Sequence, residues 1–355
     1  MFKGARLRSG ALATLLIPTL TSCTVLTGGM LRFPDSPEHV TFQNGVVSLS
    51  GILMEPEGKG PFPAVVFVHG SGPSTYDQPS WRAHANAFVR RGFAVLVYDK
   101  RGCGNSTGML ALADFDDLAG DVVAGVKFLR SLHQIRPDRV GLLGRSEGGW
   151  VAPLAATRLE AEPSDRSVAF VIMSSGAGVS PLDQTLYATA VDLRAHGASD
   201  RDVSSALAVR RRIWDYYRRA AADSTFARTG ERDSLRASLR SFAHFKSKEL
   251  PTGIPAYDAG VYGAAARSRY YEPLATLRAL RAPLLAAFGA TDRSVDPASS
   301  IAVLEKLKSE GKDITMKVFP GTGHTLLTPW WKGPPRYISG YLRLVTDWAA
   351  RQVSR

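Results

Sequence analysis

The sequence has few cysteines, no long apolar run and fewer acids than bases. Only Cys23 and Cys103 occur among 355 residues, which excludes a framework of disulfides. No apolar stretch reaches the roughly 20 residues that a membrane-spanning helix needs, and no internal repeat indicates a solenoid. What remains is an ordinary globular composition, with 45% hydrophobic and 21% charged residues.

The shortage of acids leaves a net charge of +12. Binding to nucleic acid would need a basic cluster interleaved with aromatic side chains, or a known motif. The dense basic stretches are 210–212 and 218–219, and they lie in a segment, 181–272, with 15 basic and 11 acidic residues and hence a net charge of +4. We therefore interpret these arginines as a solvated helix face and expect no nucleic-acid partner.

The amino-terminal residues resemble a bacterial export signal. Residues 1–9 are basic and lack acids, and an apolar run of about ten residues follows at 11–20, the length of a signal-peptide core. The next residues, Leu-Thr-Ser-Cys, resemble a lipobox, in which the chain is cut before the cysteine and its thiol carries diacylglycerol. We expect a lipoprotein-type signal peptide at 1–22 and lipidation of Cys23. The alternatives are an ordinary secretory signal and a buried apolar helix.

Two further expectations depend on this reading. Thr24, rather than Asp, follows Cys23, and by resemblance to Gram-negative lipoproteins this favours the outer membrane. We expect an exported protein, lipid-anchored in the bacterial cell envelope on the periplasmic face of the outer membrane. Residues 23–40 are then a tether or arm, and Cys103 is a small loop residue without a disulfide partner.

Patterns of buried strands alternate with patterns of helices along most of the chain. Such alternation predicts an α/β fold, with a mostly parallel sheet, helices on both faces and functional loops beyond the carboxyl ends of the strands. Strands are predicted at 46–54, 64–69, 93–98, 140–143, 168–173, 284–288 and 314–319, and helices at 81–91, 112–132, 148–159, 297–308 and 337–353.

One segment interrupts this alternation. Residues 181–272 have helical periodicity and no convincing strand. We predict that they form a helical cap insertion over the edge of the sheet. The core then comprises residues 41–180 and 273–355.

A glycine-rich turn, Gly144-Arg145-Ser146-Glu147-Gly148, lies between a predicted strand and a predicted helix. A serine nucleophile elbow occurs in this strand–turn–helix context. The glycines leave room for a sharp turn that aims the serine out of the sheet, and the amino terminus of the helix favours a developing negative charge. Ser146 is therefore the candidate nucleophile.

A serine nucleophile needs a base, and the base needs an orienting acid. His324 lies in a loop after the last apolar strand, at the same sheet edge as Ser146. Two acids, Asp292 and Asp296, follow the preceding strand. Because Asp296 stands directly before a proline and a helix, N-capping accounts for it. We therefore expect Asp292 to pair with His324.

Acyl transfer also needs two backbone N–H donors for an oxyanion. One is expected from Glu147, directly after the nucleophile. The other is expected from the turn His69-Gly70-Ser71-Gly72-Pro73, where glycines let the backbone approach a ligand. The amide of Ser71 is the first candidate and that of Gly72 the second, and a plain tight turn is the alternative. His69 is interpreted as a structural residue.

These segments together resemble the α/β-hydrolase superfamily, especially its serine-esterase and S33 aminopeptidase-like branch. The matching stretches follow the family order over about residues 45–350: 69–73, 99–106, 144–149, 289–292 and 323–324. The resemblance implies a triad of Ser146, Asp292 and His324, no metal and no cofactor. The stretch that begins at Asp99 is usually a structural loop. Arg145 is a departure, because His is frequent there.

The sequence thus predicts a serine hydrolase that cleaves carboxylic esters of a small-molecule or acyl substrate through an acyl-enzyme. The alternatives at the same site are amide or peptide hydrolysis, as by an aminopeptidase, and thioester hydrolysis. An alternative of another class is a non-catalytic, membrane-tethered binding protein. The substrate and the oligomeric state do not follow from the sequence, because the cap is expected to determine specificity.

Overall fold

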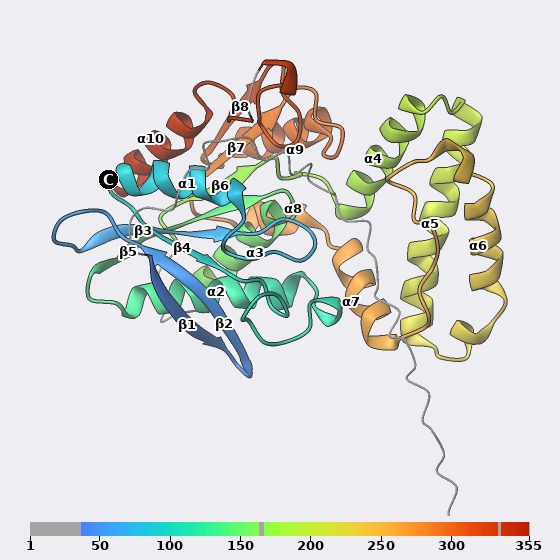
Figure 1. Ribbon diagram of the computed structural model, residues 1–355, viewed down its shortest axis with the longest axis horizontal. Coiled ribbons are helices and arrows are strands. Elements are labelled where there is room, and N and C mark those ends of the chain that lie inside the picture. The colour runs from blue at the N-terminus through green and yellow to red at the C-terminus, as the bar shows by residue number, and fades with distance from the viewer. Residues whose placement is uncertain (1–36, 163–166, 333–334, 355) are drawn as a thin grey trace, which may run out of the picture.

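The computed structural model describes residues 37–162, 167–332 and 335–354, and it contains one eight-stranded sheet (Figure 1). The strand order is β1-β2-β4-β3-β5-β6-β7-β8. The first two strands are antiparallel additions at one edge, and the other six pair in parallel. The strands are β1 (Glu38–Asn44), β2 (Val47–Met54), β3 (Phe62–Val68), β4 (Ala94–Tyr98), β5 (Ile135–Arg145), β6 (Val171–Ser174), β7 (Leu284–Gly289) and β8 (Ile314–Phe319).

Helices cover both faces of the sheet, so the expected α/β fold is confirmed. One core lies between the sheet and four helices: α2 (Phe115–Ser131), α3 (Gly148–Ala161), α8 (Pro273–Ala279) and α9 (Pro297–Ser309). The other lies between the opposite face and two helices, α1 (Pro79–Arg90) and α10 (Tyr341–Val353). Central strands such as β4 are buried at every residue, which explains their unbroken apolar sequence.

The structure adds one strand that the sequence pattern does not predict. β1 begins at Glu38, within the segment that the sequence assigns to the tether, and pairs along its length with β2. Only Val40 and Phe42 of this edge strand are buried. Two inward side chains give too weak an alternation to indicate a strand. Cys23 and the predicted signal peptide lie outside the described residues.

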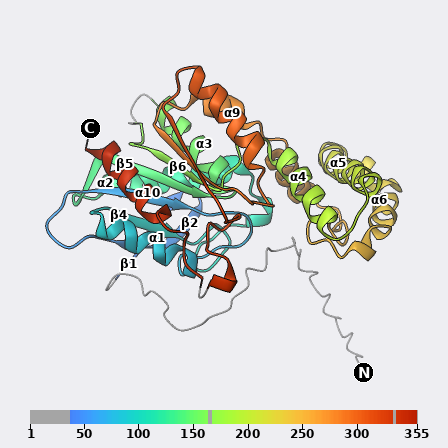
Figure 2. The ribbon, with the colours of Figure 1, turned by 90° about the horizontal axis from the view of Figure 1, so that it is seen from above.

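Residues 181–272, all of which the structure describes, form a helical body beside the core (Figure 2). Its main helices are α4 (Pro181–Ala195), α5 (Asp200–Ala222), α6 (Glu231–Arg240) and α7 (Ala259–Arg269), and it has its own apolar core around Tyr216 and Tyr262. We call residues 181–272 the cap. Within the described ranges, no helix has the length and apolarity needed to span a membrane.

The prediction that the arginines of the cap form a solvated face is wrong at one position, Arg210. Arg211 and Arg212 are exposed, but Arg210 is buried, with 8% of its surface accessible. Helical periodicity accounts for this difference, because Arg210 lies next to Val209 and one turn before Ile213, both of which are buried.

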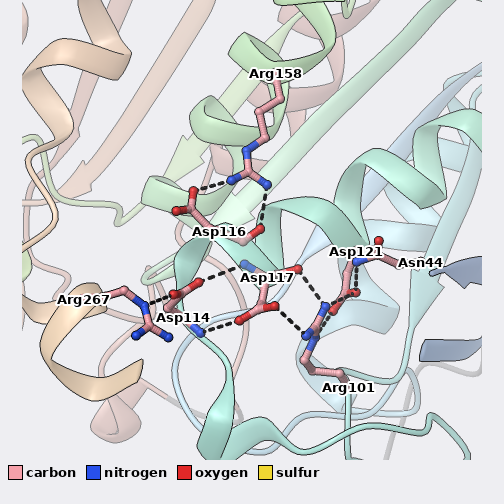
Figure 3. A network of polar contacts seen from close by, with 8 residues as sticks. All are labelled: Asn44, Arg101, Asp114, Asp116, Asp117, Asp121, Arg158 and Arg267. Carbon is pink, nitrogen blue, oxygen red and sulfur yellow. Dashed lines mark hydrogen bonds and ion pairs between the residues drawn. The ribbon is translucent and has the colours of Figure 1, made fainter. Parts of the chain in front are cut away.

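A network of charged side chains joins the cap to the core (Figure 3). Arg267 of α7 pairs with Asp114, whose carboxylate also caps α2 by accepting the amide of Asp117 at 3.0 Å. Arg101 continues the network, with a contact to Asp117 at 3.1 Å and two hydrogen bonds of 2.7 Å to the buried Asp121. The position of α7 is thus fixed against the amino terminus of α2.

Candidate active site

Ser146 lies on the turn between β5 and α3, in a conformation that few side chains adopt. Its φ is +51°, in the left-handed region, and its amide donates to Ser174 O at 3.0 Å. A side chain at Gly144 would collide with the carbonyl of Gly148, so the turn requires glycine there. The strained backbone is stabilised by the buried strands around it, as is common at functional sites.

The structure brings together the three residues that the sequence singles out. Ser146 Oγ lies 3.0 Å from His324 Nε2, and His324 Nδ1 lies 2.8 Å from Asp292 Oδ2. The second carboxylate oxygen of Asp292 accepts the amides of Ser294 and Val295 at 2.8 and 2.9 Å. The acid is fully covered, so its orientation is fixed by hydrogen bonds on both oxygens.

The neighbouring acid has a different role. Asp296 caps α9, because its carboxylate accepts the amide of Ser299 at 3.2 Å and the hydroxyl of the same residue at 2.5 Å. N-capping therefore occupies this side chain, as expected from the proline that follows it.

The cap contacts the loop that carries Asp292. Tyr187 of α4 donates its hydroxyl to Asp292 O at 2.9 Å, and Gln184 donates to Ser294 O at 2.5 Å. Sequence reasoning missed both residues, since nothing in a helical repeat shows which turn contacts a distant loop. Through these bonds the cap helps to position the acid.

Gly70 lies beside Ser146, and Ser71 follows it in the loop after β3. A Cβ atom on Gly70 would come within 3.3 Å of both Arg145 O and the Ser146 Cβ, and Ser71 is exposed. Glu147 stands at the amino terminus of α3, where backbone N–H groups have no partner within the helix. The two expected donors therefore come from segments that flank Ser146.

Lys100, which sequence reasoning did not assign, connects these two segments. Its Nζ lies 2.7 Å from Glu147 Oε1 and 3.0 Å from Gly70 O, and the side chain is 5% exposed. The preceding residue, Asp99, accepts the amides of Tyr76 and Asn105, both at 2.9 Å. Asp99 is thus engaged in holding loops, as the sequence analysis anticipates.

The side chains of His69 and Arg145 both contact Trp81. His69 accepts from Trp81 Nε1 at 2.9 Å through Nδ1, and its Nε2 contacts Tyr98 O. This pattern requires a neutral ring with the proton on Nε2. Burial, opposed by the bond to Tyr98 and aided by Lys100 and Arg145, lowers the pKa of His69 to about 3. Arg145 lies over the Trp81 ring, 5.1 Å from its centroid.

In the part of the chain that the structure describes, no three His, Cys, Asp or Glu side chains gather as a metal site. Cys103 has a free thiol and is partly buried in its loop. In hydrogen-bond contact with Ser146 the structure places the imidazole of His324, which in turn contacts the carboxylate of Asp292. A hydroxyl, an imidazole and a carboxylate in this order can move a proton.

The sheet order, the sharp turn at Ser146 and the surrounding helices define an α/β-hydrolase fold. The model of the family described as serine aminopeptidase, S33, matches residues 60–328, and the chain belongs to this family of hydrolases.

The individual relatives are similar to this chain either at low identity or over only part of its length. Esterase EstD of Thermotoga maritima is 24% identical over 316 residues, 86% of this chain and 65% of EstD. The quorum-quenching protein AidA of Acinetobacter baumannii is 35% identical over 117 residues, 33% of this chain and 38% of AidA. The chain thus spans less than two thirds of either relative. The structure of DcsB in complex with its substrate analogue covers 90% of this chain, with a TM-score of 0.55 and 19% identity, and supports the fold alone.

Proposed function

We propose that this hydrolase cleaves carboxylic esters through Ser146, His324 and Asp292, with an acyl-enzyme intermediate. The observation that carries the proposal is the row of hydrogen bonds from Ser146 Oγ to His324 at 3.0 Å and from His324 to Asp292 at 2.8 Å. A nucleophile, a base and an orienter within hydrogen-bond distance are what acyl transfer needs. The match to an esterase, EstD, supports the ester as the bond that is cleaved.

Each residue has a defined step. Ser146 Oγ attacks the carbonyl carbon while its proton passes to His324 Nε2, and the amides of Glu147 and Ser71 hold the oxyanion. Collapse of this intermediate breaks the bond to the alcohol, which takes the proton from His324. A water molecule then gives a proton to the same imidazole and attacks the acyl carbon. The bond from this carbon to Ser146 Oγ breaks, Oγ takes the proton back from His324, and the acid is released. Asp292 stabilises the imidazolium throughout.

Amide, peptide and thioester substrates remain alternatives at the same site, since they differ in the leaving group and the shape of the pocket. A non-catalytic binding protein is the alternative of another class. A fluorophosphonate probe separates the classes, because it labels an activated serine and leaves a binding protein unlabelled. We expect one label per chain, on Ser146, and a comparison of esters, aminoacyl amides and thioesters then orders the substrates.

The direct test is Ser146→Ala. We expect hydrolysis of short p-nitrophenyl esters to fall about 10⁴- to 10⁶-fold, with an unchanged circular dichroism spectrum. Ser309→Ala is the matched control, because Ser309 lies at the end of α9, where its hydroxyl bonds Lys306 O. Activity that persists in Ser146→Ala would overturn the proposal.

For the amino-terminal segment, we propose export and lipid anchoring through Cys23. The support is the order of a basic stretch, an apolar run and the lipobox-like residues before Cys23. Cells that express the full chain and are fed an alkyne fatty acid should label the wild-type protein and not Cys23→Ser. Equal labelling of both would contradict the anchor.

A further inference from the structure

Two arginines of the cap lie beside one tryptophan. Arg210 and Trp214 belong to α5, and Arg269 is the last residue of α7. The guanidinium carbon of Arg269 is 4.4 Å from the centroid of the Trp214 ring, and that of Arg210 is 5.9 Å from it. One indole therefore contacts two cations, and an anion between or beside them would offset their mutual repulsion.

Three N–H donors in this cluster are buried without an acceptor among the described residues: Arg210 Nε, Arg269 Nε and Trp214 Nε1. Arg210 forms neither a hydrogen bond nor an ion pair with any residue in the described ranges. Burial lowers the pKa of its guanidinium to about 10. Leaving buried donors without acceptors costs free energy, so these three donors indicate a site for a polar ligand.

The cluster is attached to the cap helix that contacts the loop of the proposed catalytic acid. Arg269 Nη1 donates to Pro181 O at 2.9 Å and also to the hydroxyl of Thr185. Both acceptors lie on α4, the helix that bonds the loop of the proposed catalytic acid. Burial and the charge of Arg210 lower the pKa of Arg269 to about 10, while the carboxylate of Glu147 opposes them. Arg269 is thus linked to the proposed site through α4, whose Tyr187 bonds Asp292 O.

The local charges indicate what kind of ligand fits. Burial raises the pKa of the Glu249 carboxyl, while the charges of Arg210, His324 and Arg269 lower it and that of Asp192 raises it. The ionised forms of Arg210, Arg269 and Glu249 together carry a net charge of +1. A carboxylate, with one negative charge and two oxygens matched to the N–H pairs of a guanidinium, fits this balance better than a doubly charged phosphate.

We propose that Arg210, Arg269 and Trp214 Nε1 bind a carboxylate that the substrate carries away from the ester bond. The preferred substrates are then half-esters of dicarboxylic acids, or esters whose alcohol bears a carboxylate. The inference rests on the proposed ester hydrolysis and adds the substrate class to it.

The test compares two pairs of esters that differ by one carboxylate. The acyl pair is mono-p-nitrophenyl adipate and p-nitrophenyl hexanoate, and the alcohol pair is 5-carboxypentyl butyrate and pentyl butyrate. We expect kcat/KM to favour the charged member of one pair by about 10-fold or more, and this ratio to fall about 10- to 100-fold in Arg210→Met. Arg211→Met is the matched control, because Arg211 is the exposed neighbour on the same helix.

Stability adds a readout that a structural role would not give. Since Arg210 forms no hydrogen bond with a described residue, Arg210→Met breaks none and should unfold at about the wild-type temperature, and Arg210→Lys should keep part of the preference. Ratios of one or less in both pairs, or an equal ratio in Arg210→Met, would overturn the carboxylate site while ester hydrolysis stands.

A binding measurement separates failure of this inference from failure of the proposed function. Titration calorimetry of monomethyl adipate into Ser146→Ala requires no catalysis. We expect binding that weakens about 10-fold or more in Ser146→Ala/Arg210→Met and stays the same in Ser146→Ala/Arg211→Met. If the wild type cleaves no ester but this difference is found, the anion site stands; equal binding by all three proteins would overturn it.

Discussion

Lys100 Nζ lies 2.7 Å from Glu147 Oε1 and 3.0 Å from Gly70 O. One buried cation thus bridges Glu147, the residue after Ser146, and the loop that follows β3. We propose that the amides of Ser71 and Glu147 bind the oxyanion. Glu147 is one of the two bridged residues, and Ser71 directly follows the other. Their spacing therefore depends on a side chain that touches neither amide.

Lys100→Met tests this dependence. Without the bridge the loop at 70–72 is free to move, and the two amides lose their spacing, so we expect kcat to fall about 10-fold or more with a smaller change in KM. Lys306→Met, on the exposed side of α9, is the control. Because the variant leaves Glu147 without its partner, Lys100→Met/Glu147→Gln should recover stability without recovering kcat. A wild-type kcat in Lys100→Met would contradict the bridge.

Asp292 and Asp296 offer a matched pair of substitutions. Asp292→Asn removes the charge that orients His324, and we expect kcat for p-nitrophenyl butyrate to fall about 10⁴-fold. Asp296→Asn should keep both activity and stability, because Asn caps helices as well as Asp does. Steady-state kinetics of the two purified proteins decide between them, and a larger loss in Asp296→Asn would show that the acid is misassigned.

Local sequence signals account for the fold and for the row Ser146–His324–Asp292. Each of these residues follows a strand of the parallel sheet, and the carboxyl ends of such strands meet at one edge. Lys100 also follows a strand, β4, but the local sequence does not show that its side chain turns back to Gly70 O. That direction depends on packing between segments about 30 residues apart, which no local pattern encodes.

The cap was less predictable than the core. Its helices follow from periodicity, but periodicity does not show which polar positions become buried when α5, α7 and α4 pack together. Arg210 is the clearest example, because it belongs to a run of three arginines of which the other two, Arg211 and Arg212, are exposed. The sequence does not predict β1 either, but for another reason. This edge strand has only two inward side chains, so its sequence shows almost no alternation of apolar and polar residues.

The network at the amino terminus of α2 gives a stability prediction. Asp114→Ala removes the helix cap and the partner of Arg267 together, and we expect the free energy of unfolding to fall by about 1–2 kcal/mol. Arg267→Ala should cost less than about 1 kcal/mol, because the Arg267 side chain is 62% exposed. Urea unfolding followed by circular dichroism measures both. Equal losses in the two variants would show that the ion pair, rather than the cap, carries the effect.

Two buried histidines predict how stability depends on pH. His84 is fully covered between α1 and α10, with Nε2 2.9 Å from the hydroxyl of Tyr341. Burial, aided by the charge of Arg145, lowers its pKa to about 3, as burial does for His69. In the unfolded chain both imidazoles take up a proton near pH 6.5. The unfolded state therefore binds more protons between about pH 6.5 and 3, and stability must fall as the pH falls through this range.

The loss for each histidine between pH 7 and pH 5 is about 2 kcal/mol. Urea unfolding at both pH values measures it, and the quantity of interest is the difference between them, because other groups titrate as well. His84→Gln should reduce that difference by about 2 kcal/mol whatever its own effect on stability at pH 7. The exposed His133 provides the control, and His133→Gln should keep the wild-type difference. If His84→Gln and the wild type lose the same free energy on acidification, the buried imidazole is not held neutral, and the hydrogen bonds assigned to it must be revised.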